Sequence, residues 1–184
     1  MYALPTNTPT SAPAIVVLKG GTILAAGTAS LPITLTSVLA ESALVSSATG
    51  QTDSNNAGGV ITLGERGKWG GLILLGDAPT NVATTSEIEG ISGYTYGGTD
   101  ATDSSGTLQY VRVWHGGALV SADNEINGIT FGGVGSGTTV DHCEVAYNAD
   151  DGFEFFGGTV DVKYLSVLFA GDDAFDTDEG YVGR

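Results

Sequence analysis

Residues 138–180 read TTVDHCEVAYNADDGFEFFGGTVDVKYLSVLFAGDDAFDTDEG and contain two consecutive copies of one pattern. Asp150 and Asp172 are 22 residues apart, and Val145 and Val167 have the same spacing. A period of this length, made of short β-rich runs that end at Gly and Asp turns, is typical of a solenoid whose repeats stack on one another. The stretch therefore predicts an all-β fold, a right-handed parallel β-helix.

The same register extends toward the N-terminus, where residues 107–117 align with 139–149 and residues 124–133 align with the DDGFEFFGG segment. Side chains alternate between the two faces of a strand. The alignment therefore predicts inward columns of Val111, Cys143 and Leu165; of Val113, Val145 and Val167; of Ile129, Phe153 and Phe175; and of Phe131 and Phe155. The apolar alternation continues to Tyr147 and Phe169. The expected outward columns are Tyr110, His142 and Tyr164; Arg112, Glu144 and Ser166; and Trp114, Ala146 and Leu168.

The composition of the chain predicts two regions, an N-terminal arm and one folded domain. Residues 1–13 are rich in Pro, Thr and Ser, which predicts an extended arm. Residues 14–184 are expected to form one parallel β-helix domain of about five or six coils, each rising about 4.8 Å. Loop insertions are expected at 81–106 and at 116–123, and residues 37–50 are expected to form a short helix or a further loop insertion.

Composition excludes several classes of partner. The chain has 29 Gly and only 6 Lys and Arg against 21 Asp and Glu, for a net charge of −15. This charge excludes a nucleic-acid binder and an anionic membrane surface, and it favours cations. No run of about 18 apolar residues is present, so no membrane span is predicted. Cys143 is the one cysteine and is expected to be buried and inert.

Acidic residues recur at the corners of adjacent repeats. Stacked carboxylates repel each other unless they are hydrated, protonated or bridged by a cation, and Ca²⁺ is the cation best suited to oxygen ligands. The predicted metal ligands are Asp150, Asp151, Asp172 and Asp173. Capping of turns by Asp is the stronger interpretation of the same residues.

Catalysis is a third interpretation of these corners. Asp172, Asp173 and Asp176 could act as general acid and base on a glycosidic bond. However, only Lys163 lies close in sequence to supply a basic group, and no GxSxG motif is present. The stronger prediction is that the protein is not an enzyme and has no catalytic residue.

Several segments together carry a family resemblance: GTILAAGTASLPITLTS at 21–37, RGKWGGLILLGDAPTN at 66–81, SGTLQYVRVWHGG at 105–117 and the two repeats after residue 138. From about residue 20 to 184 the chain resembles secreted bacterial right-handed β-helix proteins that are pectin-lyase-like in fold. The resemblance implies an extracellular or cell-surface location. It carries over no catalytic residues.

Two functions are consistent with these features. The first is an extracellular structural protein whose copies associate head to tail into a filament, because a β-helix exposes unpaired backbone groups at both ends unless they are covered. The alternative is a carbohydrate-active β-helix protein that binds or cleaves a polysaccharide. Tyr110, Trp114 and Tyr164 are the expected contacts with a glycan or a neighbouring subunit, because aromatic faces suit both.

Overall fold

The fold is taken from a computed structural model that describes residues 2–3, 13–37, 65–84, 86–121 and 124–184. The helix or loop insertion expected at 37–50 lies, apart from Ser37, outside the described residues. Within the described ranges every regular element is a β-strand. None of these residues forms a helix with the length and apolar character needed to cross a membrane.

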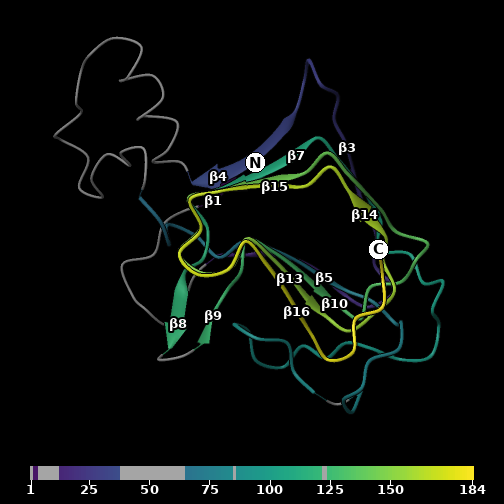
Figure 1. Cartoon of the computed structure of the whole chain (residues 1–184). Coiled ribbons are helices and arrows are strands. Elements are labelled where there is room, and N and C mark those ends of the chain that lie inside the picture. The colour runs from purple at the N-terminus through teal and green to yellow at the C-terminus, as the bar shows by residue number, and fades with distance from the viewer. Residues whose placement is uncertain (1, 4–12, 38–64, 85, 122–123) are drawn as a thin grey trace, which may run out of the picture.

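The strands form three parallel sheets that wrap around one interior, as Figure 1 shows in a view along the solenoid axis. The β7 sheet has the order β1 (Tyr2–Ala3), β4 (Ile33–Ser37), β7 (Val111–Trp114), β12 (Glu144–Ala146) and β15 (Ser166–Leu168). The β13 sheet has the order β16 (Phe175–Asp178), β13 (Phe153–Phe156), β10 (Ile129–Gly132), β5 (Leu72–Leu75) and β2 (Ile15–Val17). The β11 sheet has the order β14 (Val162–Lys163), β11 (Thr139–Asp141), β6 (Gly106–Gln109) and β3 (Ile23–Ala26).

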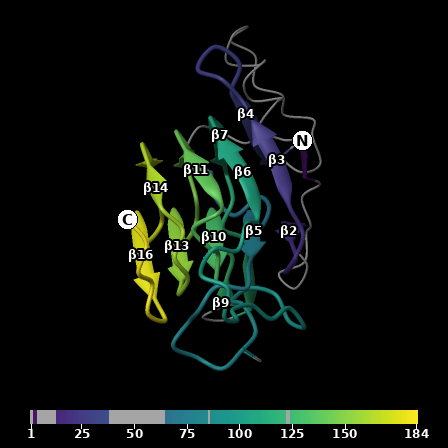
Figure 2. The same ribbon diagram turned by 90° about the vertical axis from the view of Figure 1, so that its right-hand side faces the viewer.

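Each coil visits the β13, β11 and β7 sheets in that order, and Figure 2 shows the coils side by side along the axis. The complete coils in the described part of the chain are β2–β3–β4, β5–β6–β7, β10–β11–β12 and β13–β14–β15. β16 begins a further coil, and β1 lies against β4. The chain is a parallel β-helix, with four complete coils and two partial ones where the repeat predicted about five or six.

The predicted register is confirmed at the pairs that define it. Val145 aligns with Val113 and Val167, and Phe153 aligns with Ile129 and Phe175. Because like residues then face each other across neighbouring coils, the aromatic rings stack: Phe131 and Phe155 have centroids 5.0 Å apart, and Phe153 and Phe175 have centroids 5.6 Å apart. These stacked columns form most of the interior.

Burial in the outermost coil differs from the prediction. Of the eleven residues in the inward columns, those on β7, β10, β12 and β13 and Cys143 are buried. In contrast, Leu165 and Val167 are half-buried and Phe175 is 50% exposed. The cause is their position, because no described coil packs on the far side of β15 and β16.

The corners of the β7 sheet explain a second correction. Tyr110, His142 and Tyr164 precede its strands with φ of 47°, 53° and 55°, and His115, Tyr147 and Phe169 follow them with φ of 60°, 56° and 59°. This left-handed backbone interrupts the alternation of the strand. Consequently Tyr147 and Phe169 do not continue the inward columns. Tyr147 stacks on His115, and Phe169 stacks on Tyr147, outside the core.

The two predicted insertions lie outside the solenoid. Residues 116–123 include β8 (Leu119–Ser121), which forms an antiparallel hairpin with β9 (Asn124–Glu125). The described residues of the insertion at 81–106 form no strand before β6 and only the isolated bridge between Glu87 and Thr95. It packs on the outer face of the β13 sheet through a second apolar cluster: Ile73, Leu75, Ile88, Tyr96, Ile126 and Phe156. The insertion therefore covers part of that face and brings Glu89 to it.

Candidate functional site

Five carboxylates gather where the β13 sheet meets the preceding corner, and we call them the acidic cluster: Asp150, Asp151, Glu154, Asp172 and Asp176. Glu154 on β13 is the direct partner of Asp176 on β16. The ligand oxygens of Asp151, Glu154 and Asp176 all lie within 4.8 Å of one another, and so do those of Asp150, Asp151 and Asp172. Asp151 belongs to both groups and links them into one site.

Asn127 and Glu89 extend the cluster inward. Asn127 is 1% exposed, and its Nδ2 donates a hydrogen bond to Oε2 of Glu154. Glu89, from the insertion, forms side-chain hydrogen bonds with Glu154 and Asn127. The Oδ1 atom of Asn127 is buried without a hydrogen-bond partner. Because a buried acceptor without a partner is costly, this oxygen is an additional candidate ligand at the cluster.

Burial and mutual repulsion shift the pKa values of these carboxyls upward. Desolvation, followed by the charges of Glu89 and Asp151, raises the pKa of Glu154 to about 9. Desolvation, followed by the charge of Asp151, raises the pKa of Asp150 to about 7. Desolvation also raises the pKa of Asp151 to about 6. Both causes favour the protonated form, and a bound cation would favour the ionised form instead.

The described cations of the protein do not neutralise this site. Lys and Arg ion pairs in the described ranges all involve acidic residues outside the cluster: Asp77, Glu65, Glu144, Asp141 and Asp161. The acidic cluster is therefore a concentration of carboxyl oxygens without a neighbouring ammonium or guanidinium partner among those pairs. Oxygen-rich, negatively charged sites of this kind suit Ca²⁺.

Three of the four metal ligands expected from sequence lie together, and the fourth does not. Asp150, Asp151 and Asp172 come together, whereas Asp173 is exposed and belongs to neither group. The backbone N–H of Asp173 donates a hydrogen bond of 2.8 Å to Oδ1 of Asp151, so one Asp caps the corner of the next coil. Of the three alternative catalytic residues, Asp172 and Asp173 are exposed, and only Asp176 lies beside Glu154.

Sequence reasoning missed Glu154, although it lies at the centre of the site. The residue is part of the apolar run FEFF, which predicts a core strand and no metal ligand. Its outward position follows from the alternation that places Phe153 and Phe155 inside. The signal that could have revealed it is its register with Asp176, 22 residues later.

A second group of side chains lies on the β7 sheet. The rings of Tyr110 and His142 have centroids 4.5 Å apart, and so do those of His142 and Tyr164. Trp114 lies at the other end of β7 and is not part of this stack. Its Nε1 donates a hydrogen bond of 2.8 Å to Oε1 of Glu144. The structure therefore brings Tyr110 and Tyr164 together through His142 and places Trp114 beside Glu144.

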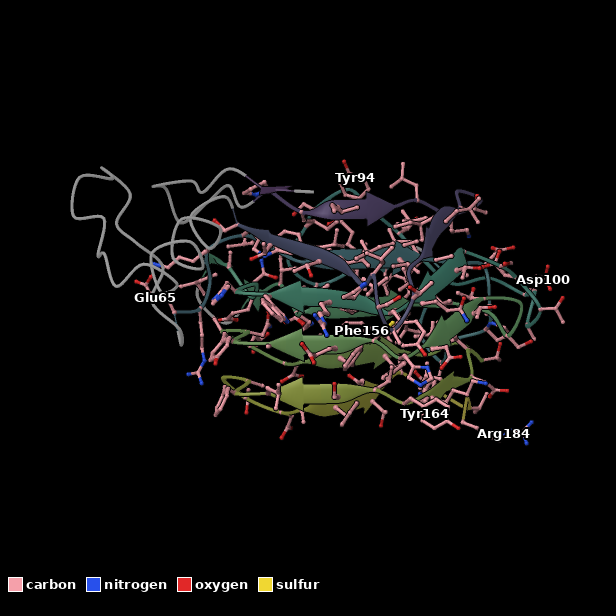
Figure 3. The ribbon with its side chains drawn as sticks, turned by 90° about the horizontal axis from the view of Figure 1, so that it is seen from above. Glu65, Tyr94, Asp100, Phe156, Tyr164 and Arg184 are labelled. Carbon is pink, nitrogen blue, oxygen red and sulfur yellow. The ribbon has the colours of Figure 1, made fainter. Side chains whose placement is uncertain are left out.

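A pocket of about 170 Å³ adjoins the aromatic stack. Its walls are formed by Ala29, Pro32, Tyr110, Arg112, His142, Cys143, Glu144, Tyr164 and Ser166. Figure 3 views the molecule from the side of the β7 sheet and labels Tyr164, which lies in the last coils of the stack. The molecule thus carries two candidate sites on different sheets.

Comparison with known proteins gives one match. A family model described as a pectate-lyase-like β-helix domain matches residues 3–184. Neither the curated proteins nor the solved structures give a significant match.

Proposed function

Because this chain belongs to the family of pectate-lyase-like β-helix domains, we propose that it is an extracellular carbohydrate-active protein that binds an acidic polysaccharide through Ca²⁺ at the acidic cluster. The fold fits extracellular and carbohydrate-active β-helix proteins. The acidic polysaccharide and the bridging Ca²⁺ are proposed from the chemistry of the cluster.

One observation carries the proposal: oxygens of Asp151, Glu154 and Asp176 lie within 4.8 Å of one another beside the buried amide of Asn127. Ca²⁺ takes six to eight oxygen ligands in flexible geometry. Asp172 is exposed and Asp176 is half-buried, so one side of the cluster faces solvent. A carboxylate of a uronic-acid polymer can approach from this side and complete the coordination of the cation.

The same geometry favours binding over cleavage. Glycosidases keep their two carboxyls roughly 5–5.5 Å apart, or about 6.5–9.5 Å apart when a water molecule attacks. Here three carboxyl oxygens lie within 4.8 Å. In addition, none of the Lys and Arg ion pairs in the described ranges involves a residue of the cluster, so these pairs bring no basic side chain to it. We therefore propose a binding protein.

The test is calorimetric titration of the whole chain with a galacturonic-acid hexamer, in Ca²⁺ and in EDTA. Binding is expected only with Ca²⁺, and Glu154→Gln and Asp176→Asn should each weaken it at least tenfold, because each removes one anionic ligand. Asp161→Asn is the matched control, because Asp161 pairs with Arg184 away from the cluster. Equal affinity in EDTA, or release of unsaturated or shortened products, would contradict the proposal.

Self-assembly into a filament is a second candidate, and the exposed apolar side chains of the outer coils favour it. Leu24 is 84% exposed and Leu31 is 76% exposed on the first complete coil, and Phe169 and Phe175 are 62% and 50% exposed at the opposite end. Among the described strands, β14, β15 and β16 each have a partner on one side only. Such edges can pair with another copy of the chain. Within the chain, the short strand β1 pairs in parallel with β4, which shows the geometry that an added strand would take.

Light scattering and electron microscopy across a concentration series test this second candidate. Filaments are expected to grow with concentration and to disappear in Phe175→Lys, which places a charge on the exposed end coil. Leu119→Lys is the control, because Leu119 is 47% exposed on the hairpin, away from either end of the stack. A monodisperse monomer at high concentration would exclude assembly.

A further inference from the structure

We propose that the pocket on the β7 sheet is the centre of a second binding site, a groove that takes a neutral, extended glycan without a metal ion. Two columns of outward side chains form this groove, which we call the corner groove. One column is Tyr110, His142 and Tyr164, and the other is Arg112, Glu144 and Ser166. The inference goes beyond the proposed function, because it involves another sheet and no cation.

The repeat of the fold gives the groove its direction. Glu144 pairs with Arg112 on one side and with Ser166 on the other. Successive coils are about 4.8 Å apart, and side chains two positions apart on a strand are about 7 Å apart. The groove therefore runs across three coils, parallel to the solenoid axis. This spacing presents equivalent positions at an interval close to the length of one sugar residue in an extended chain.

The side chains of the groove combine an aromatic surface with fixed polar groups. Tyr164 is 68% exposed at the outer end of the stack and can pack against the apolar face of a sugar ring. Nε of Arg112 lies 3.8 Å from Oε1 of Glu144, and the same oxygen accepts a hydrogen bond from Trp114. A positioned guanidinium beside a positioned carboxylate offers donors and acceptors to neighbouring hydroxyl groups. These features describe a carbohydrate site.

The charges around the groove select a neutral ligand. Oδ1 of Asp141 lies 2.6 Å from Nδ1 of His142, and Glu144 is part of the groove itself. Nζ of Lys163 lies 3.8 Å from Oδ2 of Asp141, so Arg112 and Lys163 balance Glu144 and Asp141, and the groove has no excess charge that would attract an ionic polymer. A peptide ligand is disfavoured at the centre of the groove for a different reason: β7 and β12 both have partners on two sides, and among the described groove strands only β15, at the outer end, has an open edge for β-strand addition.

Calorimetry in EDTA tests the site directly, with cellohexaose, xylohexaose and mannohexaose as probes. At least one of these neutral hexasaccharides should bind, and Tyr164→Asn should weaken that binding at least tenfold. Asn is chosen because it tolerates the left-handed backbone at this position, where φ is 55°. Phe169→Asn is the matched control, since it has φ of 59° and 62% exposure but belongs to the stack at the other corner.

A second variant separates loss of the site from loss of the fold. Ser166→Trp fills the groove from an exposed position, so it should abolish binding while the unfolding temperature stays within about 2–4 °C of the parent. Binding that survives both Tyr164→Asn and Ser166→Trp would overturn the proposal. So would the absence of binding to all three probes in EDTA, whatever the result with the galacturonic-acid hexamer in Ca²⁺.

Discussion

Asn127 and Glu154 are hydrogen-bonded to each other in a buried position, and they come from adjacent coils of the solenoid. The bond connects the segment before β10 with the outward face of β13. Glu89, from the long insertion, joins the same pair. A buried carboxyl thus lies between two coils and the insertion that covers them, so its protonation state affects both packing and any cation bound there.

The folding stability of the metal-free protein should fall as pH rises. Glu154 has a folded-state pKa of about 9, compared with its ordinary value of 4.5. A raised carboxyl pKa means that the folded state holds a proton that the unfolded state has lost. The resulting stabilisation is complete below about pH 4.5 and disappears as pH rises through about 9. Asp150 and Asp151 add to the same slope through about pH 7 and 6.

Calorimetry in EDTA at several pH values measures this effect. We expect the unfolding temperature at about pH 5 to exceed that at about pH 9 by several degrees, since about 1 kcal/mol corresponds to roughly 2–4 °C in a domain of this size. Glu154→Gln should flatten the profile, because its amide remains neutral throughout. A profile that rises from pH 5 to 9 in the parent protein would refute this prediction.

Ca²⁺ should stabilise the folded protein most at alkaline pH, where the acidic cluster carries the most charge. A ligand that binds only the folded state adds about 2.7 kcal/mol at one hundred times its dissociation constant. We expect Asp176→Asn to remove most of the Ca²⁺-dependent rise in unfolding temperature. Asp100→Asn should keep it, because Asp100 is an exposed turn residue that accepts hydrogen bonds from Thr102. Equal stabilisation of both variants would place the cation elsewhere.

The register between neighbouring coils could be predicted from the sequence, because a period-two alternation and a 22-residue repeat allow one consistent alignment of the repeats. Phe153 and Val145 could therefore be placed correctly. Glu154 could not be identified as a site residue, because its surroundings depend on an insertion that the repeat does not describe. Phe169 was misplaced for a different reason: left-handed corner residues interrupt the alternation, and three of the six at these corners are Tyr.

Cys143 should be unreactive in the folded protein and reactive once it unfolds. Its side chain is 1% exposed, and burial raises the pKa of its thiol to about 11, so little thiolate is present near neutral pH. Labelling with a disulfide reagent at about pH 8 should be negligible in native buffer and complete in denaturant. Because the chain has no other cysteine, the labelling rate reports opening of the core alone. Fast labelling in native buffer would contradict the burial.

Phe153 and Phe175 lie in one column with nearly parallel rings, yet they should contribute unequally to stability. Phe153 is fully buried between β10 and β16, and truncation of such a side chain costs about 3–5 kcal/mol through lost burial and a residual cavity. Phe175 is 50% exposed and, in the described part of the chain, has a neighbouring coil on one side only, so Phe175→Ala should cost roughly half as much as Phe153→Ala. Denaturant unfolding of the two variants, at a protein concentration where the parent is monomeric, gives the comparison. If Phe175→Ala proved as costly as Phe153→Ala under those conditions, the outermost coil would have to be covered in solution. If the stability losses of the two variants differ at low protein concentration and become equal at high concentration, the exposed ring of Phe175 takes part in self-association.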